Sequence, residues 1–221
     1  MRSKFIREMH RYIVTLVLLL FICNSCFSVQ QGGVQYVIPI DYSIIDEAAL
    51  NNEAESLFSS YMAAEDEKQK KILLERMLSS YSILGNIDKG NPLYFTRLGI
   101  IFDKMGRDRY AKSNFCRATN LVPDYAYGFN CYGDFFFERS MYIKALREYM
   151  RAYNAGYQNN YDTLYQIGSV YEKLGDFTSA VGFYRKASAV KSSPELSEKI
   201  KNLEELLKNN SIYDEQRGMR K

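Results

Sequence analysis

The chain is almost devoid of histidine: its 221 residues include only His10. After residue 25 there is none, which excludes Ser–His–Asp and Cys–His catalytic sets and histidine metal sites from the rest of the chain. That part also has no Cys-x-x-Cys pair, no zinc-ligand spacing and no glycine-rich phosphate loop. These absences count against catalysis, and we expect neither an enzyme activity nor a metal or cofactor.

A long apolar run is absent as well. A membrane-spanning helix needs about 20 apolar residues, whereas the run Tyr12–Cys23 has twelve and includes the polar Thr15. Four basic residues precede it: Arg2, Lys4, Arg7 and Arg11. A short run behind a basic flank is typical of a secretory signal peptide, so we expect residues 1–25 to be a targeting segment.

The end of this segment leaves three possibilities open. The stretch Ile22–Cys26 resembles the signal of bacterial lipoproteins, which is cut just before a cysteine, here Cys26. Its thiol would then carry acyl chains, in which each buried CH₂ adds about 0.8 kcal/mol of membrane affinity. We favour this lipid-anchored form in the bacterial cell envelope, facing the periplasm, on either membrane. The alternatives are simple secretion after cleavage near residues 24–28 and an uncleaved anchor.

The excess positive charge of the chain lies in the same segment. The full chain has 29 basic and 26 acidic residues, and residues 1–25 hold four of the former and one of the latter, which leaves 25 of each. Nucleic-acid-binding domains usually carry a basic patch. With a net charge of zero after residue 25, we expect no nucleic-acid partner.

Two further cysteines follow Cys26, at Cys116 and Cys131. In an oxidising compartment they could form one disulfide. Because they fall on different expected helices and need not face each other, we expect two independent thiols instead.

A repeat of 34 residues runs through 92–125, 126–159 and 161–194. Each block contains a large apolar residue followed by glycine, then an aromatic residue, an alanine, a second aromatic residue and a second alanine at fixed offsets. The glycines are Gly99, Gly133 and Gly168, and the second aromatic residues are Phe115, Tyr149 and Tyr184. Small residues let helices approach closely, so the pattern predicts paired helices with an aromatic core.

This pattern resembles the tetratricopeptide repeat, a family of 34-residue helix–turn–helix units. Pro123 occupies the family's proline position, which Tyr157 takes in the second block. Ser140 replaces the inter-helix glycine that the other blocks have as Gly106 and Gly175. The resemblance implies an all-α fold, a right-handed solenoid of antiparallel helix pairs with a C-terminal capping helix, because one pair cannot bury its apolar face alone.

The segments around the repeats are expected to differ from them. Residues 26–44 would be a tether, and 45–91 a divergent helical hairpin or degenerate repeat, although one long helix through 65–71 is an open alternative. We expect a capping helix over 195–210 and a flexible tail over 211–221.

The resemblance also implies a groove lined by the first helix of each pair, where a protein or peptide partner would bind. The expected groove residues are Tyr127, Asn130, Asp134, Phe137, Glu138, Tyr165, Ser169, Glu172 and Lys173. Aromatic residues in such a groove would anchor a peptide. For Tyr127, Phe137 and Tyr165, packing between repeats is the alternative.

Two other uses of the groove are disfavoured. Asn130 stands where one subfamily has a clamp for acidic C-terminal tails, but Asp162 and Gln166 replace the basic residues that such a clamp needs. Asp134 and Glu138 share a helical face and could form a carboxylate pair for acid–base chemistry. We expect them to be a solvated acidic strip.

Taken together, the sequence predicts a membrane-anchored, non-catalytic adaptor that holds a protein partner in the cell envelope. The resemblance allows outer-membrane protein assembly, pilus assembly, or envelope and flagellar-motor structures. The alternative is a cell-envelope enzyme or its regulatory subunit.

Overall fold

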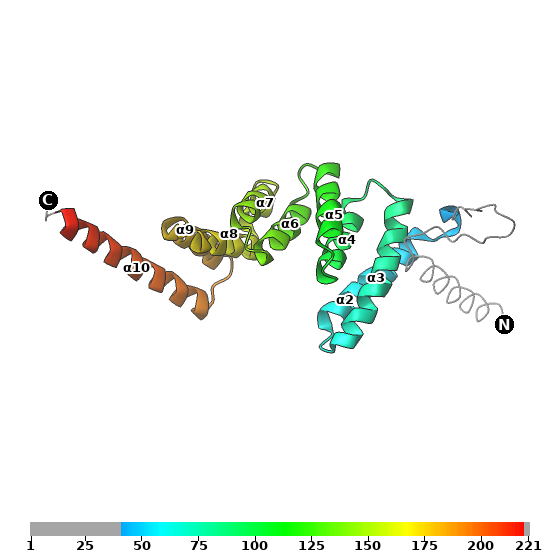
Figure 1. Ribbon diagram of the computed structural model, residues 1–221, viewed down its shortest axis with the longest axis horizontal. Helices are drawn as coiled ribbons and strands as arrows, with labels where there is room; N and C mark the ends of the chain where they lie inside the picture. Colours follow the sequence, from blue (N-terminus) through cyan, green and yellow to red (C-terminus); the bar gives the residue numbers. More distant parts are fainter. Residues whose placement is uncertain (1–40, 219–221) are drawn as a thin grey trace. The chain divides into compact units, whose positions relative to one another are not determined.

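The computed structural model describes residues 41–218, and this part of the chain is helical without strands. The predicted all-α repeat fold is therefore confirmed (Figure 1). The helices are α2 Glu47–Ala63, α3 Glu67–Ile87, α4 Pro92–Lys104, α5 Asp108–Leu121, α6 Ala126–Glu138, α7 Tyr142–Asn154, α8 Tyr161–Lys173, α9 Phe177–Val190 and α10 Pro194–Gly218, with short 3₁₀ turns at Tyr42–Ile44 and Tyr157–Asn159. The described residues divide into two compact units, which separate between Lys89 and Gly90.

The first unit contains the helical hairpin of α2 and α3. The two helices are separated by the non-helical residues 64–66. Asp66 is the N-cap of α3 and accepts a hydrogen bond from the backbone N–H of Gln69 at 2.8 Å. One long helix through this stretch is thereby excluded. The hairpin buries Ala54, Leu57, Met77, Tyr81 and Leu84.

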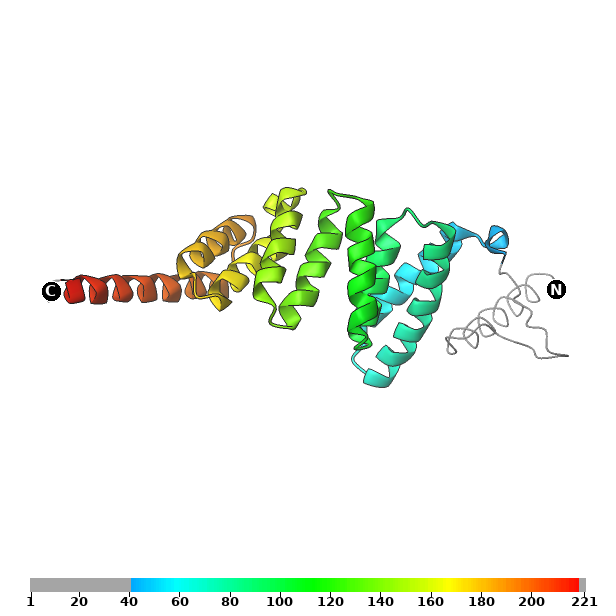
Figure 2. The ribbon, with the colours of Figure 1, turned by 45° about the horizontal axis from the view of Figure 1, so that its top comes forward.

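The second unit contains three helix pairs, α4–α5, α6–α7 and α8–α9, whose members pack against each other. The second helix of one pair then packs on the first helix of the next, α5 on α6 and α7 on α8. Figure 2 shows these pairs following one another along the chain. The sequence repeat thus becomes a repeat in space.

A glycine in the first helix of each pair allows the two helices to approach closely. A Cβ atom added to Gly99 would lie 2.7 Å from the ring of Phe115, and one on Gly168 would lie 2.7 Å from the ring of Tyr184. Gly133 meets the ring of Tyr149 in the same way. The ring of each second helix therefore rests directly on the backbone of the first helix.

The turn inside each pair uses a left-handed residue. Gly106 has φ 69° and Gly175 has φ 80°. Ser140 adopts the same conformation, φ 56°, in the second pair. A side chain in this region costs about 1–2 kcal/mol, so the replacement of glycine by serine leaves the geometry intact and adds strain.

The C-terminal helix departs from the prediction. Ser193 accepts a hydrogen bond from the backbone of Leu196 and caps α10. Leu196, Ile200, Leu203 and Leu207 pack against the last pair. The helix continues to Gly218, however, so the expected end of the capping helix at residue 210 is wrong. The flexibility expected of residues 211–221 stays a prediction.

Several predictions concern the N-terminus or the cysteines. The predicted signal segment 1–25, the predicted lipidation site Cys26 and the part of the expected tether up to residue 40 lie outside the described residues. Residues 42–44, expected in the tether, form a 3₁₀ turn.

Cys116 is exposed, Cys131 is buried, and both are free thiols, as predicted. Among the described helices, none combines the length and apolar character that a membrane span requires.

Candidate functional site: the first-helix face

We call the surface formed by α4, α6 and α8 the first-helix face. Four side-chain hydrogen bonds join successive helices across it. From α4 to α6, Arg97 donates to the hydroxyl of Tyr127 and Lys104 donates to Glu138, both at 2.8 Å. From α8 to α6, Thr163 donates to Asn130 at 2.7 Å and Gln166 donates to Asp134 at 2.5 Å. Four of the expected groove residues, Tyr127, Asn130, Asp134 and Glu138, therefore take part in contacts between successive first helices.

Asp134 is the most strongly perturbed acid on this face. Its Oδ1 accepts both the Gln166 amide and, at 2.7 Å, the hydroxyl of Tyr149 from within its own pair. Burial raises the pKa of Asp134 to about 6, which outweighs the lowering effect of the Tyr149 hydrogen bond. Because Asp134 is partly buried and its Oδ1 accepts two hydrogen bonds from side chains, the expectation of a solvated acidic strip is wrong for it. Glu138 is exposed, as that interpretation required.

The aromatic groove residues serve packing and keep part of their surface open. Tyr127 and Phe137 pack against the core that α5, α6 and α7 share, and Tyr165 packs against the core of the last pair. The Phe137 ring meets Tyr142 edge-on, with centroids 5.7 Å apart. All three side chains are only half-buried. Packing of these residues, the alternative that the sequence left open, is therefore observed, whereas their binding of a partner stays a prediction.

The far end of the face is closed by the capping helix. Lys199 of α10 forms an ion pair with Glu172 at 2.8 Å, and Tyr184 donates a hydrogen bond to Glu172 at 2.6 Å. Burial by itself would raise the pKa of Glu172, but these two contacts outweigh it and hold the pKa below its ordinary value. Ser169 lies beside the Tyr184 hydroxyl, whereas Lys173 is exposed.

The sequence did not single out the partners of these groove residues. Arg97, Thr163 and Lys199 each complete a hydrogen bond or ion pair on the face. The sequence contained part of the information needed to find them. The partners Arg97 and Tyr127 are 30 residues apart and Asn130 and Thr163 are 33 apart, which is close to one repeat length. A polar residue one period away from a groove residue is a reasonable candidate for its partner.

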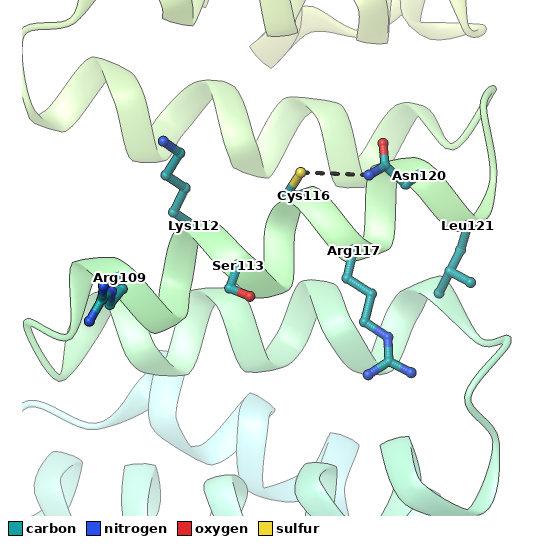
Figure 3. Close-up of a pocket in the computed structure, with 7 residues that line it drawn as sticks. All are labelled: Arg109, Lys112, Ser113, Cys116, Arg117, Asn120 and Leu121. Carbon is teal, nitrogen blue, oxygen red and sulfur yellow. Dashed lines mark hydrogen bonds between the residues drawn. The ribbon is translucent and has the colours of Figure 1, made fainter.

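No group of three or more metal-ligating side chains occurs within residues 41–218. A shallow depression does occur elsewhere, on the outer side of the first pair (Figure 3). Its lining comes from a single helix, α5: Arg109, Lys112, Ser113, Cys116, Arg117, Asn120 and Leu121. Because this surface is separate from the first-helix face, the unit presents two distinct candidate surfaces.

Comparison with known proteins places the third helix pair in a family. A family model described as "Tetratricopeptide repeat" matches residues 161–193. The Protein bimA of Emericella nidulans is 32% identical over 110 residues. That match covers 50% of this chain and 14% of bimA, so the chain spans only a small part of that relative.

Two solved structures have a similar fold. A MamA double mutant from RS-1 superimposes with a TM-score of 0.60 and 14% identity, covering 78% of this chain and 92% of that chain. PilF of Pseudomonas aeruginosa superimposes with a TM-score of 0.58 and 18% identity, covering 75% of this chain and 71% of that chain. At these identities the comparison establishes the shared helical-repeat architecture.

Proposed function

Since the chain is a tetratricopeptide-repeat protein, we propose that it is a non-catalytic scaffold that binds a protein partner on its first-helix face. The observation that carries the proposal is the ladder of hydrogen bonds between successive first helices. These bonds fix the surface before a partner arrives, and a preorganised surface loses less entropy on binding. An extended or helical peptide segment of a partner would lie across α4, α6 and α8.

The half-buried aromatic residues would supply the affinity. Tyr127, Phe137 and Tyr165 are held from behind by core packing and present their remaining surface outward. Rigid aromatic residues of this kind are frequent energetic centres of protein interfaces. Exposed Glu138 and Lys173 at the edge would contribute mainly to specificity and association rate.

We propose further that the scaffold is held at a membrane of the bacterial cell envelope, with its repeats in the periplasm. The support is the sequence before residue 41: a basic flank, a short apolar run and Cys26 at its end. Acyl chains on Cys26 would tether the repeats to the membrane. Such a tether would let the protein recruit its partner to an envelope complex during assembly.

The partner proposal can be tested with a charge swap on the face. Glu138→Lys/Lys173→Glu leaves the net charge unchanged and alters two exposed residues. A matched control, Lys71→Glu/Asp124→Lys, alters two exposed residues outside the first-helix face. After crosslinking in cells and purification from membranes, we expect a stoichiometric protein partner with the wild type and the control. Its recovery should fall at least about fivefold with the first-helix variant.

Equal partner recovery with all three proteins would reject binding at this face. Recovery of no stoichiometric partner at all would reject the scaffold itself. Circular dichroism melting of each variant verifies that the repeats remain folded.

The anchor is tested separately with Cys26→Ser. Metabolic labelling with a fatty acid should mark the wild type and spare the variant, and the variant should leave membranes that are washed with high salt, which screens charge-based binding. An unlabelled wild type that stays with salt-washed membranes would identify an uncleaved anchor. An unlabelled wild type in the soluble fraction would identify simple secretion.

An envelope enzyme, or its regulatory subunit, is the competing function. The observation in its favour is Asp134, because a carboxyl group with a pKa raised to about 6 is a feature of catalytic sites. Its two hydrogen bonds give it a structural use instead. Turnover of envelope substrates by the purified protein without a partner, abolished by Asp134→Asn, would support the enzyme.

A further inference from the structure

The second helices of the three pairs carry an excess of positive charge. We call the surface formed by α5, α7 and α9 the second-helix face. Its exposed basic residues are Arg109, Lys112, Arg117, Lys144, Arg147, Arg151, Arg185 and Lys186. Only two acids lie on these helices: Asp108, which is exposed, and Glu148, which is buried. The second-helix face is therefore strongly basic.

The first helices have the opposite balance. Their acids are Asp103, Asp134, Glu138, Asp162 and Glu172, and their bases are Arg97, Lys104 and Lys173. The near-zero net charge of the chain after residue 25 thus hides a separation of charge between the two sides of the repeats. A charged face of this kind attracts an anionic partner even when the whole protein is neutral.

The basic charge is strongest on α5 and α7, because few acids compensate it there. Within the described residues, no carboxylate forms an ion pair with Arg109, Lys112 or Lys144. Asp108 is engaged by Arg139. On α9, in contrast, Arg185 is paired with Glu204 of the capping helix at 2.8 Å.

On α7, Glu148 forms ion pairs with two arginines, Arg147 and Arg151. The side chain of Glu148, only 2% exposed, accepts from Arg147 at 2.9 Å and from Arg151 at 3.0 Å. The guanidinium of Arg151 also stacks over the ring of Phe129, 3.9 Å from its centroid. These contacts hold both arginines in place and leave a net positive charge at the surface.

The depression on α5 has the chemistry of an anion site (Figure 3). Arg109, Lys112 and Arg117 supply positive charge, and Ser113 and Asn120 supply neutral hydrogen-bond donors. The guanidinium of Arg117 is held 3.7 Å above the ring of Phe95. A stacked guanidinium keeps its N–H groups in the ring-parallel plane, from which they can donate to phosphate oxygens.

Apolar side chains stand among these cations. Ile143, at the start of α7 and next to Lys144, is 77% exposed. Tyr110 and Leu121 of α5 are also exposed. Cations interleaved with exposed aliphatic and aromatic side chains match the interfacial region of a bilayer, where apolar groups enter the headgroup layer and cations meet phosphates. Nucleic acid would use the cations but offers no comparable site for Ile143.

We propose that the second-helix face, centred on α5 and α7, docks on an anionic phospholipid surface. This binding goes beyond the proposed scaffold function and does not depend on acylation of Cys26. Docked in this way, the repeats would keep the first-helix face on the side away from the lipid, open to a partner.

The test uses the full chain and vesicles of phosphatidylcholine, with or without 30% phosphatidylglycerol, in co-sedimentation at low and high salt. The variant Arg109→Glu/Lys112→Glu/Lys144→Glu reverses the three unpaired cations. A matched control, Lys68→Glu/Lys71→Glu/Lys89→Glu, reverses three exposed cations of the first unit. All proteins share the same N-terminal segment, so differences between the variants report on the repeats.

We expect the wild type and the control to prefer the anionic vesicles, with a preference that weakens as salt increases. Because each cation near such a surface changes affinity about fivefold, the second-helix variant should bind them at least about 20-fold more weakly. Equal losses in variant and control would overturn the proposal, as would indifference to phosphatidylglycerol. So would a higher affinity for duplex DNA than for vesicles, removed by the same variant. Partner recovery in the crosslinking experiment should be unaffected, which separates this result from the scaffold.

Discussion

The hairpin of α2 and α3 and the three repeat pairs differ in the residues at the contact between their two helices. The hairpin and two of the repeat pairs place a buried tyrosine of the second helix against an acid of the first, whereas Phe115 takes this position in the α4–α5 pair. Tyr81 donates to Glu55 at 2.7 Å in the hairpin, as Tyr149 donates to Asp134 in the repeats. In the repeats the ring also rests on a glycine, whereas α2 contains no glycine and buries Ala54 instead.

The turns between paired helices also differ between the repeats and the hairpin. Each repeat pair turns through a left-handed residue at Gly106, Ser140 or Gly175. The hairpin turns at residues 64–66, where Ala64 and Asp66 have φ −72° and −77°. The tyrosine–acid contact thus belongs to helix pairs in both units, and the glycine contact and the left-handed turn belong to the repeats. The comparison predicts different sensitivities for the two units.

The largest effect should come from Gly133→Ala. The added methyl group would overlap the ring of Tyr149 and force the two helices apart. Overpacking of this kind costs about 1–3 kcal/mol, and the rigid contact between backbone and ring favours the upper end. Urea unfolding should show the loss, and hydrogen exchange should show faster opening in α6 and α7 than in α2 and α3.

Gly182→Ala is the control for this prediction. Gly182 lies within α9, and an added Cβ would meet nothing within 4 Å. Alanine should therefore raise stability by about 0.5–1 kcal/mol through its higher helix propensity. Equal effects of the two substitutions would show that the glycine contact does not distinguish the repeats.

A second effect should depend on pH. The pKa of Asp134 is raised from 3.8 to about 6 in the folded protein, so ionisation of this group costs folding free energy. The cost is absent below pH 4, grows between pH 4 and 6, and is complete above pH 6. Asp134→Asn keeps the acceptor for Tyr149 and Gln166 and should be about 2 kcal/mol more stable than the wild type at pH 7.

Chemical denaturation from pH 4 to pH 8 measures this difference. The gap between variant and wild type should close as the pH falls from 6 to 4. A difference in unfolding free energy that stays constant from pH 4 to pH 6 would mean that Asp134 does not titrate in this range.

The smallest effect concerns the turn of the second pair. Ser140→Gly should raise stability by about 0.5–1 kcal/mol, because glycine adopts φ 56° without the side-chain penalty but loses more entropy on folding. The matched change Gly175→Ala should lower it by a similar amount. Thermal melts of the two variants give the comparison. A destabilised Ser140→Gly would show that the hydrogen bond from the Tyr142 hydroxyl to Ser140, 3.3 Å long, outweighs the backbone strain.

The repeat pattern was sufficient to predict the helix pairs. Gly99, Gly133 and Gly168 recur at one period with their partner rings, and this regularity has few structural explanations. The hairpin was harder to predict, because its helices are longer than those of the repeats and Asp66 is the main signal for the break between them. The extent of α10 was missed because residues 211–218 lack an apolar stripe.

The candidate site was predicted as a set of positions but not as a network. Helical periodicity places Tyr127, Asn130 and Asp134 on one face of α6. It does not show that Thr163 and Gln166 of the next pair reach them. The burial of Asp134 also escaped prediction, since an acid on a helix is ordinarily solvated.

The sequence by itself determined the helical repeat and the residues at each pair's contact, because close backbone approach requires glycine beneath an aromatic ring. The tertiary structure alone decided which polar groups meet between pairs. It also decided which cations of the second helices remain without an ion-pair partner. Both depend on how neighbouring pairs stack, and the local pattern that makes a helix pair leaves this stacking undetermined.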